Sequence, residues 1–347
     1  MKVLHLLQSN RFSGAENVVC QIIGMMKNEP DIEMIYCSRD GQISEALNER
    51  NISFASIKEL SVKEVKRVIK EQKPDIIHAH DRSACVTAAM ASKNIPIIAH
   101  IHVNNNSGVN SLLKNVVFTC FSKKYRHVFW VSDSAYDKFQ FKSIISRKSS
   151  VLYNVIDMKS LSEKADSDVS EYDYNIVYVG RLSYQKNPER LMKILHGVIQ
   201  KKPDVKAAIV GNGEYEQFVV DYIRDNNLIN NIGYLGYLNN PLKIIRSSKV
   251  LVMTSRFEGT PMVALEAQCL GVPIVSTPVD GMKKVVQNGE NGYLADSDDE
   301  IVSHLLEIVS DENKHKLLSD NSLQQAINYN DMNKYCASIV GAYNGKR

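Results

Sequence analysis

The sequence predicts an α/β protein built from two Rossmann-like domains, each a doubly wound parallel sheet, that face a cleft. Two observations support this prediction. Short apolar runs alternate with helical or polar stretches along both halves of the chain, and a polar segment separates the halves. Alternation of this kind favours parallel strands joined by right-handed crossovers. A chain of 347 residues is long for one domain and sufficient for two that each bury a core.

The first domain is expected over residues 1–158, where six apolar runs predict strands. Each run is short and is followed by a helical or polar stretch, as in a parallel sheet. The runs are VLHLLQS (3–9), MIYCS (34–38), DIIHAH (75–80), PIIAHIH (96–102), HVFWVS (127–132) and SVLYN (150–154).

Residues 159–173, KSLSEKADSDVSEYD, are polar and acidic, which predicts a linker. A second domain is expected over 174–328, and a helix over 329–347, where Met332, Tyr335, Ile339 and Tyr343 have helical spacing. The strands expected in the second domain are NIVYVG (175–180), VKAAIVG (205–211), NIGYLG (231–236), KVLVMTS (249–255), PIVST (273–277) and NGYLA (291–295).

The composition is that of a globular enzyme, with 44% hydrophobic and 23% charged residues. No apolar run reaches the length of a membrane-spanning helix, and the apolar start MKVLHLLQSN is too short for a signal peptide. The six cysteines form no CxxC pair, so neither a zinc site nor a disulfide framework is indicated. A reducing cytoplasmic compartment fits this pattern.

Charge is distributed unevenly. Residues 1–150 hold 21 Lys and Arg against 14 Asp and Glu, whereas the remainder holds 21 against 25. The stretch 111–150 interleaves basic residues with aromatic ones, which suits an anionic membrane or a phosphate-bearing acceptor; a solvated basic face over an aromatic core is the alternative. No recognised motif supports nucleic-acid binding. The residues are Lys114, Lys123, Lys124, Arg126, Lys138, Lys142, Arg147 and Lys148, with Phe118, Phe121, Tyr125, Phe129, Phe139 and Phe141.

The stretch SRFEGTPMVALEA (255–267) is the most informative part of the chain. It follows an apolar strand and places Glu258 in a Gly-containing turn and Glu266 in the helix that follows. Thr260 suits the N-cap and Pro261 the first helical position. A helix N-terminus binds anions, and carboxylates accept hydrogen bonds from pairs of sugar hydroxyls. The stretch therefore predicts a site for a ligand that carries both phosphate and sugar.

Five motifs together make the chain resemble one known family. They are the Glu258-x7-Glu266 spacing, YVGRLSYQKN (178–187), IVGNGE (209–214), SGAEN (13–17) and IIAHIH (97–102). One pair of glutamates is a weak signal, but this set in this order covers nearly the whole chain. The chain is similar to the GT-B retaining glycosyltransferases of the family 4 type (glycosyl transferases group 1), which include many bacterial capsule and exopolysaccharide enzymes.

The resemblance implies that the first domain binds the acceptor, that the second binds the nucleotide-sugar, and that the C-terminal helix crosses back to the first. It implies transfer of a sugar from a nucleotide-diphosphate donor, most commonly a UDP-sugar, to a hydroxyl of a glycan or lipid-linked acceptor, with retention of configuration. The nucleotide-sugar is a substrate, and no cofactor or metal is expected. The expected location is cytoplasmic, with peripheral contact at the inner face of the plasma membrane.

The resemblance also assigns the candidate site residues. Arg181 and Lys186 are expected to hold the donor diphosphate, a task that suits a planar guanidinium and a compact ammonium. Glu258 is expected to contact the donor sugar, and His102 to line the cleft beside it. The remaining donor-binding candidates are Gly14, Gly213, Gly259, Thr260, Pro261 and Glu266, the last contacting the ribose.

Other patterns suggest metals or a different cofactor only weakly. His78 and His80 lie on one face of a strand, but no acidic or cysteine partner at suitable spacing supports a metal site. The triplets Asp166-Ser167-Asp168 and Asp296-Ser297-Asp298 lie in the linker and at an expected helix start, so neither suits magnesium. Gly211-Asn212-Gly213 lacks the third glycine of a dinucleotide fingerprint and reads as a tight turn near a nucleotide.

Three other functions stay open from sequence alone. A GT-B epimerase or hydrolase would consume the donor without an acceptor. A nicotinamide oxidoreductase would bind NAD, although the fingerprint for it is absent. A non-catalytic nucleotide-sugar binding protein would bind the donor without turnover.

Overall fold

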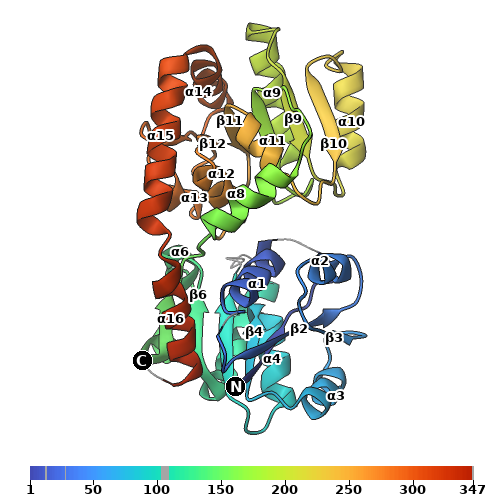
Figure 1. Cartoon of the computed structure of the whole chain (residues 1–347), viewed down its shortest axis with the longest axis vertical. Helices are drawn as coiled ribbons and strands as arrows, with labels where there is room; N and C mark the ends of the chain where they lie inside the picture. The colour runs from blue at the N-terminus through green and yellow to red at the C-terminus, as the bar shows by residue number, and fades with distance from the viewer. Residues whose placement is uncertain (12–13, 28, 103–108, 346–347) are drawn as a thin grey trace. The chain divides into compact units, whose positions relative to one another are not determined.

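The structure is a computed structural model that describes residues 1–11, 14–27, 29–102 and 109–345 (Figure 1). The chain divides into two compact units. Unit 1 comprises Met1–Asn154 and Met332–Arg347, and unit 2 comprises Val155–Asp331. Both are doubly wound parallel sheets, which confirms the predicted fold class.

Unit 1 contains a seven-stranded sheet in the order β3-β2-β1-β4-β5-β6-β7, with all neighbours parallel. The order reverses between β1 and β4, the kind of position where open α/β sheets bind ligands. Its main elements are β1 Lys2–Leu6, α1 Gly14–Met25, β2 Glu33–Arg39, α2 Ile43–Glu49, β3 Phe54–Ile57, α3 Val62–Gln72, β4 Ile76–His80, α4 Asp81–Ala91, β5 Ile97–Ile101, α5 Val109–Cys120, β6 Tyr125–Trp130, α6 Asp133–Asp137, α7 Lys142–Ile145, β7 Ser149–Val151 and α16 Met332–Tyr343.

The two faces of this sheet differ in chemistry. One face is apolar, with Leu4, Ile77 and Ala99 packed in a core that α3, α4 and α5 complete. Because strand side chains alternate between faces, the intervening residues of β1, β4 and β5 point the other way, and several of them are histidines. Tyr343 of α16 packs on this second face against His78.

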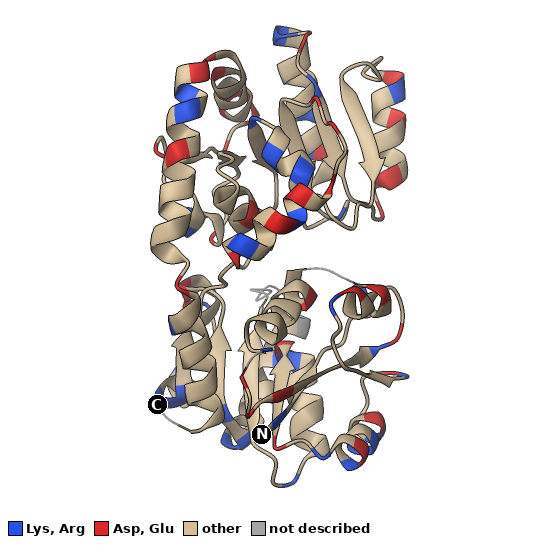
Figure 2. Cartoon of the chain, viewed as in Figure 1, with Lys and Arg blue, Asp and Glu red and all other residues tan. Residues whose placement is uncertain are grey.

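Unit 2 contains a six-stranded parallel sheet in the order β10-β9-β8-β11-β12-β13. Its strands carry no charged residue, whereas helices such as α8 and α15 carry several (Figure 2). Its elements are α8 Met158–Ser167, β8 Ile176–Val179, α9 Pro188–Lys201, β9 Ala207–Val210, α10 Glu216–Asp225, β10 Ile232–Gly236, α11 Leu242–Ser247, β11 Val250–Met253, α12 Met262–Cys269, β12 Ile274–Ser276, α13 Met282–Val285, β13 Gly292–Leu294, α14 Asp298–Ser310 and α15 Glu312–Tyr329.

Hydrophobic cores cover both faces of the second sheet. Residues of α9, α10 and α14 form one core, and residues of α11, α12 and α13 form the other. Strands buried on both faces read as continuous apolar runs, which is why every strand of unit 2 was visible in the sequence.

Three local differences from the sequence expectations have physical causes. The first is β3, which has only four residues at the sheet edge and shows no apolar run. The second is the predicted linker, where α8 forms because Asp157 caps its start and Leu161 and Ala165, four residues apart, are buried. The third is the last segment: Tyr329 ends α15, and a separate helix, α16, starts at Met332.

In the parts of the chain that the structure describes, no helix combines the length and the apolar character required to cross a membrane.

Candidate active site

The topological switch point of unit 2 brings the predicted diphosphate-binding and sugar-binding residues together. β8 and β11 are neighbours, with Ile176 opposite Val250 and Val177 opposite Leu251. The loops that follow them, 180–187 and 254–261, therefore leave the same edge of the sheet side by side. Open parallel sheets bind ligands outside the carboxyl ends of their strands at such a point.

A buried ion pair links the two loops. Lys186 Nζ lies 2.6 Å from Glu258 Oε1, and the Glu258 side chain is 6% exposed. Ser255 Oγ donates to the same carboxylate oxygen at 2.6 Å, and Gln185 Nε2 lies 3.4 Å from Oε2. Three side chains thus hold the carboxylate in one orientation, and Oε2 keeps acceptor capacity for a hydroxyl.

Backbone contacts fix the loops to each other. Thr254 Oγ1 donates to the carbonyl oxygens of Lys186 and Asn187, at 3.0 and 3.2 Å. The Arg256 amide donates to Gln185 O at 2.8 Å, and its guanidinium lies over the Tyr184 ring. The ion pair is therefore held in place by the scaffold on both sides, as a pre-organised site requires.

Arg181 differs from Lys186 because its guanidinium is exposed and makes no hydrogen bond or ion pair with the residues that the structure describes. Its carbonyl oxygen accepts a hydrogen bond from Tyr178 Oη at 3.2 Å, which anchors its backbone. Burial, and secondarily the nearby Glu258 charge, raise the pKa of Tyr178, so this phenol stays a neutral donor. The fork of Arg181 is thus available for an anion.

Helix α12 starts one residue later than the sequence suggested. Pro261 is the N-cap, with φ −71° and ψ 123°, and Met262 is the first helical residue, so the assignment of Thr260 as cap and Pro261 as first helical residue was wrong. The proline has an extended backbone, which the N-cap requires, and it needs no amide hydrogen there. Gly259 and Pro261 are buried in the loop, and Glu266 is half-buried within α12.

Glycines allow the loops to approach closely. A Cβ on Gly211, whose φ is 126°, would lie 2.1 Å from Gly180 O, and one on Gly213 would lie 2.2 Å from Leu182 O. A Cβ on Gly281 would lie 1.4 Å from Gly259 O. Gly213 therefore supports the loop that carries Arg181 and Lys186, and its direct contact with a donor stays a prediction.

In unit 1, His102 follows β5 directly and belongs to a group of five buried histidines. Its backbone amide donates to Asp81 Oδ1 at 3.1 Å, and Asp81 has φ 70°, a strained left-handed conformation for a residue with a side chain. His5, His78, His80 and His100 complete the group, on β1, β4 and β5.

Burial lowers the pKa of all five imidazoles. The pKa of His5 and that of His102 fall to about 3, and those of the other three fall well below the usual value, with the neighbouring histidines adding to the shift. The rings are therefore neutral near pH 7 and act as hydrogen-bonding groups without charge.

Two triplets of these histidines, His5-His78-His80 and His80-His100-His102, place ring nitrogens within 4.8 Å of one another. The sequence showed the spacing of His78 and His80 but not the neighbouring strands that complete the triplets. The two DxD triplets have other contacts: Ser297 forms a capping box with Glu300, and Asp166 pairs with Arg246 at 2.7 Å.

Gly14 is the first residue of α1, and a Cβ there would meet no atom within 4 Å. Ser13, its partner in the sequence motif, lies outside the described residues. Nothing at this position shows a ligand contact, so the predicted donor role of Gly14 stays a prediction.

The basic stretch 111–150 is partly structural. Lys124 Nζ donates to the carbonyl oxygens of Ala89 and Ser92, and Lys148 Nζ to those of Ser122 and Tyr125. The aromatic residues of the stretch are buried in the core of unit 1 or pack against it. This agrees with the alternative interpretation, in which the aromatic residues belong to the core.

Helix α5 instead presents aliphatic side chains outward. Leu112, Leu113, Val116 and Val117 are exposed on one side of it, whereas Ser111, Asn115 and Phe118 are buried on the other. Lys114 on the same helix and Lys123 just after it are exposed. We call Leu112, Leu113, Val116 and Val117 the α5 stripe; it is an apolar surface next to cationic residues.

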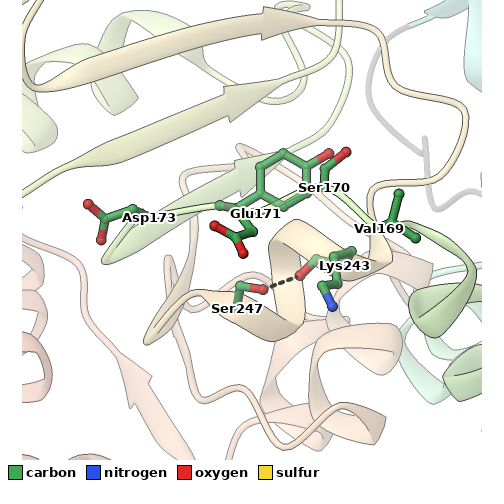
Figure 3. Close-up of a pocket in the computed structure, with 7 residues that line it drawn as sticks. Val169, Ser170, Glu171, Asp173, Lys243 and Ser247 are labelled. Carbon is green, nitrogen blue, oxygen red and sulfur yellow. Dashed lines mark hydrogen bonds between the residues drawn. The ribbon is translucent and has the colours of Figure 1, made fainter.

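A pocket elsewhere in unit 2 is lined by residues 169–173 together with Lys243 and Ser247 of α11 (Figure 3). These segments lead into the amino ends of β8 and β11. The pocket therefore lies at the sheet edge opposite the Lys186–Glu258 pair, where a parallel sheet does not place its ligand site.

Several residues that shape the site were not predicted from the sequence. Ser255 lies three residues before Glu258, and Gln185 lies directly before Lys186, both within motifs described above. Their polar side chains next to motif residues could have marked them as site residues. His5 and Gly281 gave no such signal, because their contacts depend on strand order and on loop packing.

Family models match the two halves of the chain separately. Residues 12–160 match the model described as Glycosyltransferase Family 4, and residues 161–325 match the model described as Glycosyl transferases group 1.

Two bacterial relatives align over most of their length. The chain is 25% identical to the UDP-Gal:alpha-D-GlcNAc-diphosphoundecaprenol alpha-1,3-galactosyltransferase of Escherichia coli, over 94% of this chain and 92% of that protein. It is also 25% identical to the lipopolysaccharide 1,6-galactosyltransferase of Salmonella typhimurium, over 88% of each. A capsular polysaccharide biosynthesis glycosyltransferase, CapM of Staphylococcus aureus, is 26% identical over 53% of this chain and 48% of that protein.

Solved structures share the fold. Anabaena Alr3699/HepE in complex with UDP-glucose superposes with a TM-score of 0.84 at 23% identity, over 99% of each chain. The sucrose-phosphate synthase of Thermosynechococcus elongatus superposes with a TM-score of 0.77 at 15% identity, over 99% of this chain and 98% of that one.

Proposed function

Because the chain belongs to the glycosyl transferases group 1 and is a GT-B glycosyltransferase, we propose that it moves a hexosyl group from a UDP-sugar to an acceptor hydroxyl with retention. The acceptor is a glycan or lipid-linked intermediate of a bacterial surface polysaccharide. The observation that carries the proposal is the buried Lys186–Glu258 pair at the switch point of unit 2, beside the exposed Arg181. The names of the relatives support the donor and acceptor classes, since they include UDP-Gal and a diphosphoundecaprenol-linked sugar.

In this proposal the donor occupies the carboxyl edge of the unit 2 sheet. Lys186 has three N–H donors and gives one to Glu258, which leaves two for phosphate oxygens. Arg181 supplies a bidentate fork to the same diphosphate, and Gly259, Thr260 and Pro261 surround it at the start of α12. Glu258 accepts from hydroxyls of the sugar, and Glu266 accepts from the ribose.

The proposed chemistry is a same-face substitution. The bond between the anomeric carbon and the donor phosphate oxygen breaks, and its electron pair leaves with UDP. The acceptor oxygen bonds to the anomeric carbon through an oxocarbenium-like state, and its proton passes to a donor phosphate oxygen. Arg181, Lys186 and the α12 N-terminus offset the charge that develops on the diphosphate, so the scheme needs no metal. Glu258, with one oxygen engaged by Lys186 and Ser255, orients the sugar and is not the nucleophile.

The α5 stripe supports contact with an anionic membrane. An apolar helix face next to Lys114 and Lys123 has the composition of an interfacial membrane-binding surface. A lipid-linked acceptor would be presented at that surface, which gives the stripe a reason to be exposed. In this proposal the enzyme is cytoplasmic and peripheral at the inner face of the plasma membrane.

The test of transfer is product analysis by NMR, with UDP-glucose, UDP-galactose and UDP-N-acetylglucosamine as donors and an undecaprenyl-diphosphate sugar as acceptor. We expect an α-linked product from one α-linked donor, and its loss in the Glu258→Gln variant but not in the control Asp320→Asn, an exposed acid on α15. An inverted linkage would contradict retention. Donor consumption without acceptor would indicate a hydrolase or epimerase instead, and binding without turnover a non-catalytic protein.

The test of membrane contact is co-sedimentation with vesicles containing phosphatidylglycerol. We expect the Leu113→Gln/Val117→Gln variant to bind these vesicles weakly, and Leu317→Gln, on an exposed position of α15, to bind like the wild type. Equal sedimentation of all three proteins, or none at all, would contradict this part of the proposal.

A further inference from the structure

Three of the five buried histidines form a hydrogen-bonded row, which we call the imidazole chain: His5, His80 and His102. His5 Nδ1 lies 3.1 Å from His80 Nε2, and His80 Nδ1 lies 2.8 Å from His102 Nε2. His80 thus uses both of its ring nitrogens within the row.

The geometry shows that these contacts are in-line hydrogen bonds. The ring centroids lie 5.4 Å apart for His5 and His80 and 5.1 Å apart for His80 and His102, with interplanar angles of 18° and 26°. In both pairs the centroid separation exceeds the nitrogen–nitrogen distance by the same amount, as expected when each bond runs from ring edge to ring edge. Nitrogen lone pairs and N–H bonds lie in the ring plane, so nearly coplanar rings give good bond angles.

The same distances disfavour a metal between the rings. Two imidazole nitrogens bound to one zinc ion at about 2.0–2.1 Å in tetrahedral geometry would lie roughly 3.3 Å apart. The His80–His102 distance of 2.8 Å is shorter than that and is typical of N–H···N contact. A ring that uses both nitrogens for its neighbours also has none left for a metal.

A row of neutral imidazoles has only two hydrogen-bond polarities, because each ring has one donor and one acceptor nitrogen. Donation runs either from His5 through His80 to His102 or in the reverse direction. The end atom, His5 Nε2, is buried with no hydrogen-bond partner among the described residues. In the first polarity it is an acceptor, and in the second it is an N–H donor. An orphaned buried N–H is the rarer case, so the first polarity is favoured.

We propose that His5 and His80 are positioning residues that hold His102 in the tautomer with its hydrogen on Nδ1, so that His102 offers a neutral N–H donor to a sugar oxygen. The contact with sugar rests on the proposed function and on the expectation that His102 lies beside the transferred sugar, whereas the tautomer rests on the imidazole chain alone. His102 accepts from His80 at Nε2, so Nδ1 is the nitrogen left to donate. The backbone amide of His102 is held by Asp81 Oδ1, and its ring is held by the contact with His80.

The test is a long-range 1H–15N correlation spectrum of the full chain with 15N-labelled histidine rings at pH 7.5, with His102 assigned through a His102→Gln variant. We expect Nδ1 of His102 to carry the hydrogen in the wild type. In His5→Phe, which removes the first donor, a mixture of tautomers should appear. His5→Gln, whose amide can donate to His80, should restore the wild-type pattern. His127 contacts Ser150 and is not part of the imidazole chain, so His127→Gln should leave the pattern unchanged.

Three outcomes would overturn the inference. They are a hydrogen on His102 Nε2 in the wild type, an unchanged His102 tautomer in His5→Phe, and a shift of the ring nitrogen resonances of the imidazole chain on addition of one equivalent of Zn²⁺. The wild-type spectrum alone decides the first, even if His5→Phe does not fold. If transfer activity is found, kcat/KM should fall about tenfold in His5→Phe and recover in His5→Gln. The expected tautomer without any transfer activity would sink the proposed function and leave this inference standing.

Discussion

The carboxyl ends of the two sheets carry different kinds of polar group. In unit 1, β4 ends at His80, His100 is the penultimate residue of β5, and His102 follows that strand; all three are buried, and burial keeps them neutral. In unit 2, the loops after β8 and β11 hold the Lys186–Glu258 ion pair and the exposed Arg181. Both sheets have the same strand order through their first six strands, so topology does not set this difference. The difference lies in which residues occupy the carboxyl ends of the strands and the loops that follow them.

The difference has a chemical meaning. Neutral donors and acceptors suit hydroxyls, which carry no charge, whereas fixed cations suit a diphosphate. One topology therefore provides two binding chemistries, and each should fail in its own way when perturbed.

The largest expected effect is that of acid on unit 1. A base whose pKa is lowered by folding takes up protons more readily when unfolded, so the free energy of unfolding should fall as pH drops from about 6.5 toward 3. Each histidine contributes up to about 1.4 kcal/mol per pH unit in that range. Urea unfolding at pH 7.5 and 5.5, followed by emission of the single tryptophan, Trp130 of unit 1, measures this.

A matched pair of variants sharpens that test. His100 has no hydrogen-bond partner on either ring nitrogen among the described residues, so His100→Phe should weaken the pH dependence. His196→Gln in unit 2 should not change it. A midpoint that stays constant between the two pH values would contradict the neutral state of the cluster.

The second effect is loss of catalysis in Lys186→Ala. Removing one electrostatic donor at a transition state typically costs about 10²–10³ in kcat. The variant also leaves Glu258 buried without its cation, so the free energy of unfolding should fall. The double variant Lys186→Ala/Glu258→Gln should recover part of that loss. Steady-state kinetics and urea unfolding measure the two effects. Lys193→Ala, exposed on α9, is the control, and activity within threefold of wild type in Lys186→Ala would contradict the assignment.

The third effect concerns the close approach of Gly211 to Gly180, where the loop that carries Lys186 begins. Gly211→Ala should lower the free energy of unfolding by about 1–3 kcal/mol, because the new Cβ meets Gly180 O and the backbone has positive φ. Gly24→Ala, in helix α1 with open space around it, should instead raise stability by about 0.5–1 kcal/mol. Thermal unfolding of both variants tests this, and equal shifts would refute the close-approach role of Gly211.

The smallest expected effect on folding is that of Arg181→Ala. The guanidinium is exposed and makes no hydrogen bond or ion pair with the described residues, so the free energy of unfolding should change by less than about 0.5 kcal/mol. Donor affinity should nevertheless fall roughly 10-fold to 100-fold, the size of a lost charge-assisted hydrogen bond. Calorimetric titration with the donor measures this. A large loss of stability with unchanged affinity would reverse the proposed role.

The sequence predicted the parts of the fold that depend on local pattern. Continuous apolar runs revealed all six strands of unit 2, since both faces of that sheet are buried. β3 escaped because four residues at an edge need no apolar run, and α8 escaped because only Leu161 and Ala165 of its mostly polar sequence are buried.

The site was predictable where a motif marks it and not where strand order creates it. Glu258 and Lys186 stood out as motif residues, but their contact joins positions 72 residues apart and follows from the pairing of β8 with β11. The imidazole chain likewise needs β1, β4 and β5 side by side, which no local pattern in the sequence specifies.

The most direct test of the central claim, that the carboxyl end of the unit 2 sheet binds a nucleotide diphosphate, is a thermal-shift comparison with UDP, GDP, ADP and NAD. We expect UDP at a hundred times its dissociation constant to stabilise the wild type and the control Asp320→Ala by about 2.7 kcal/mol. The shift should be lost in Glu266→Ala. No response to any nucleotide, or a response to NAD alone, would contradict the account.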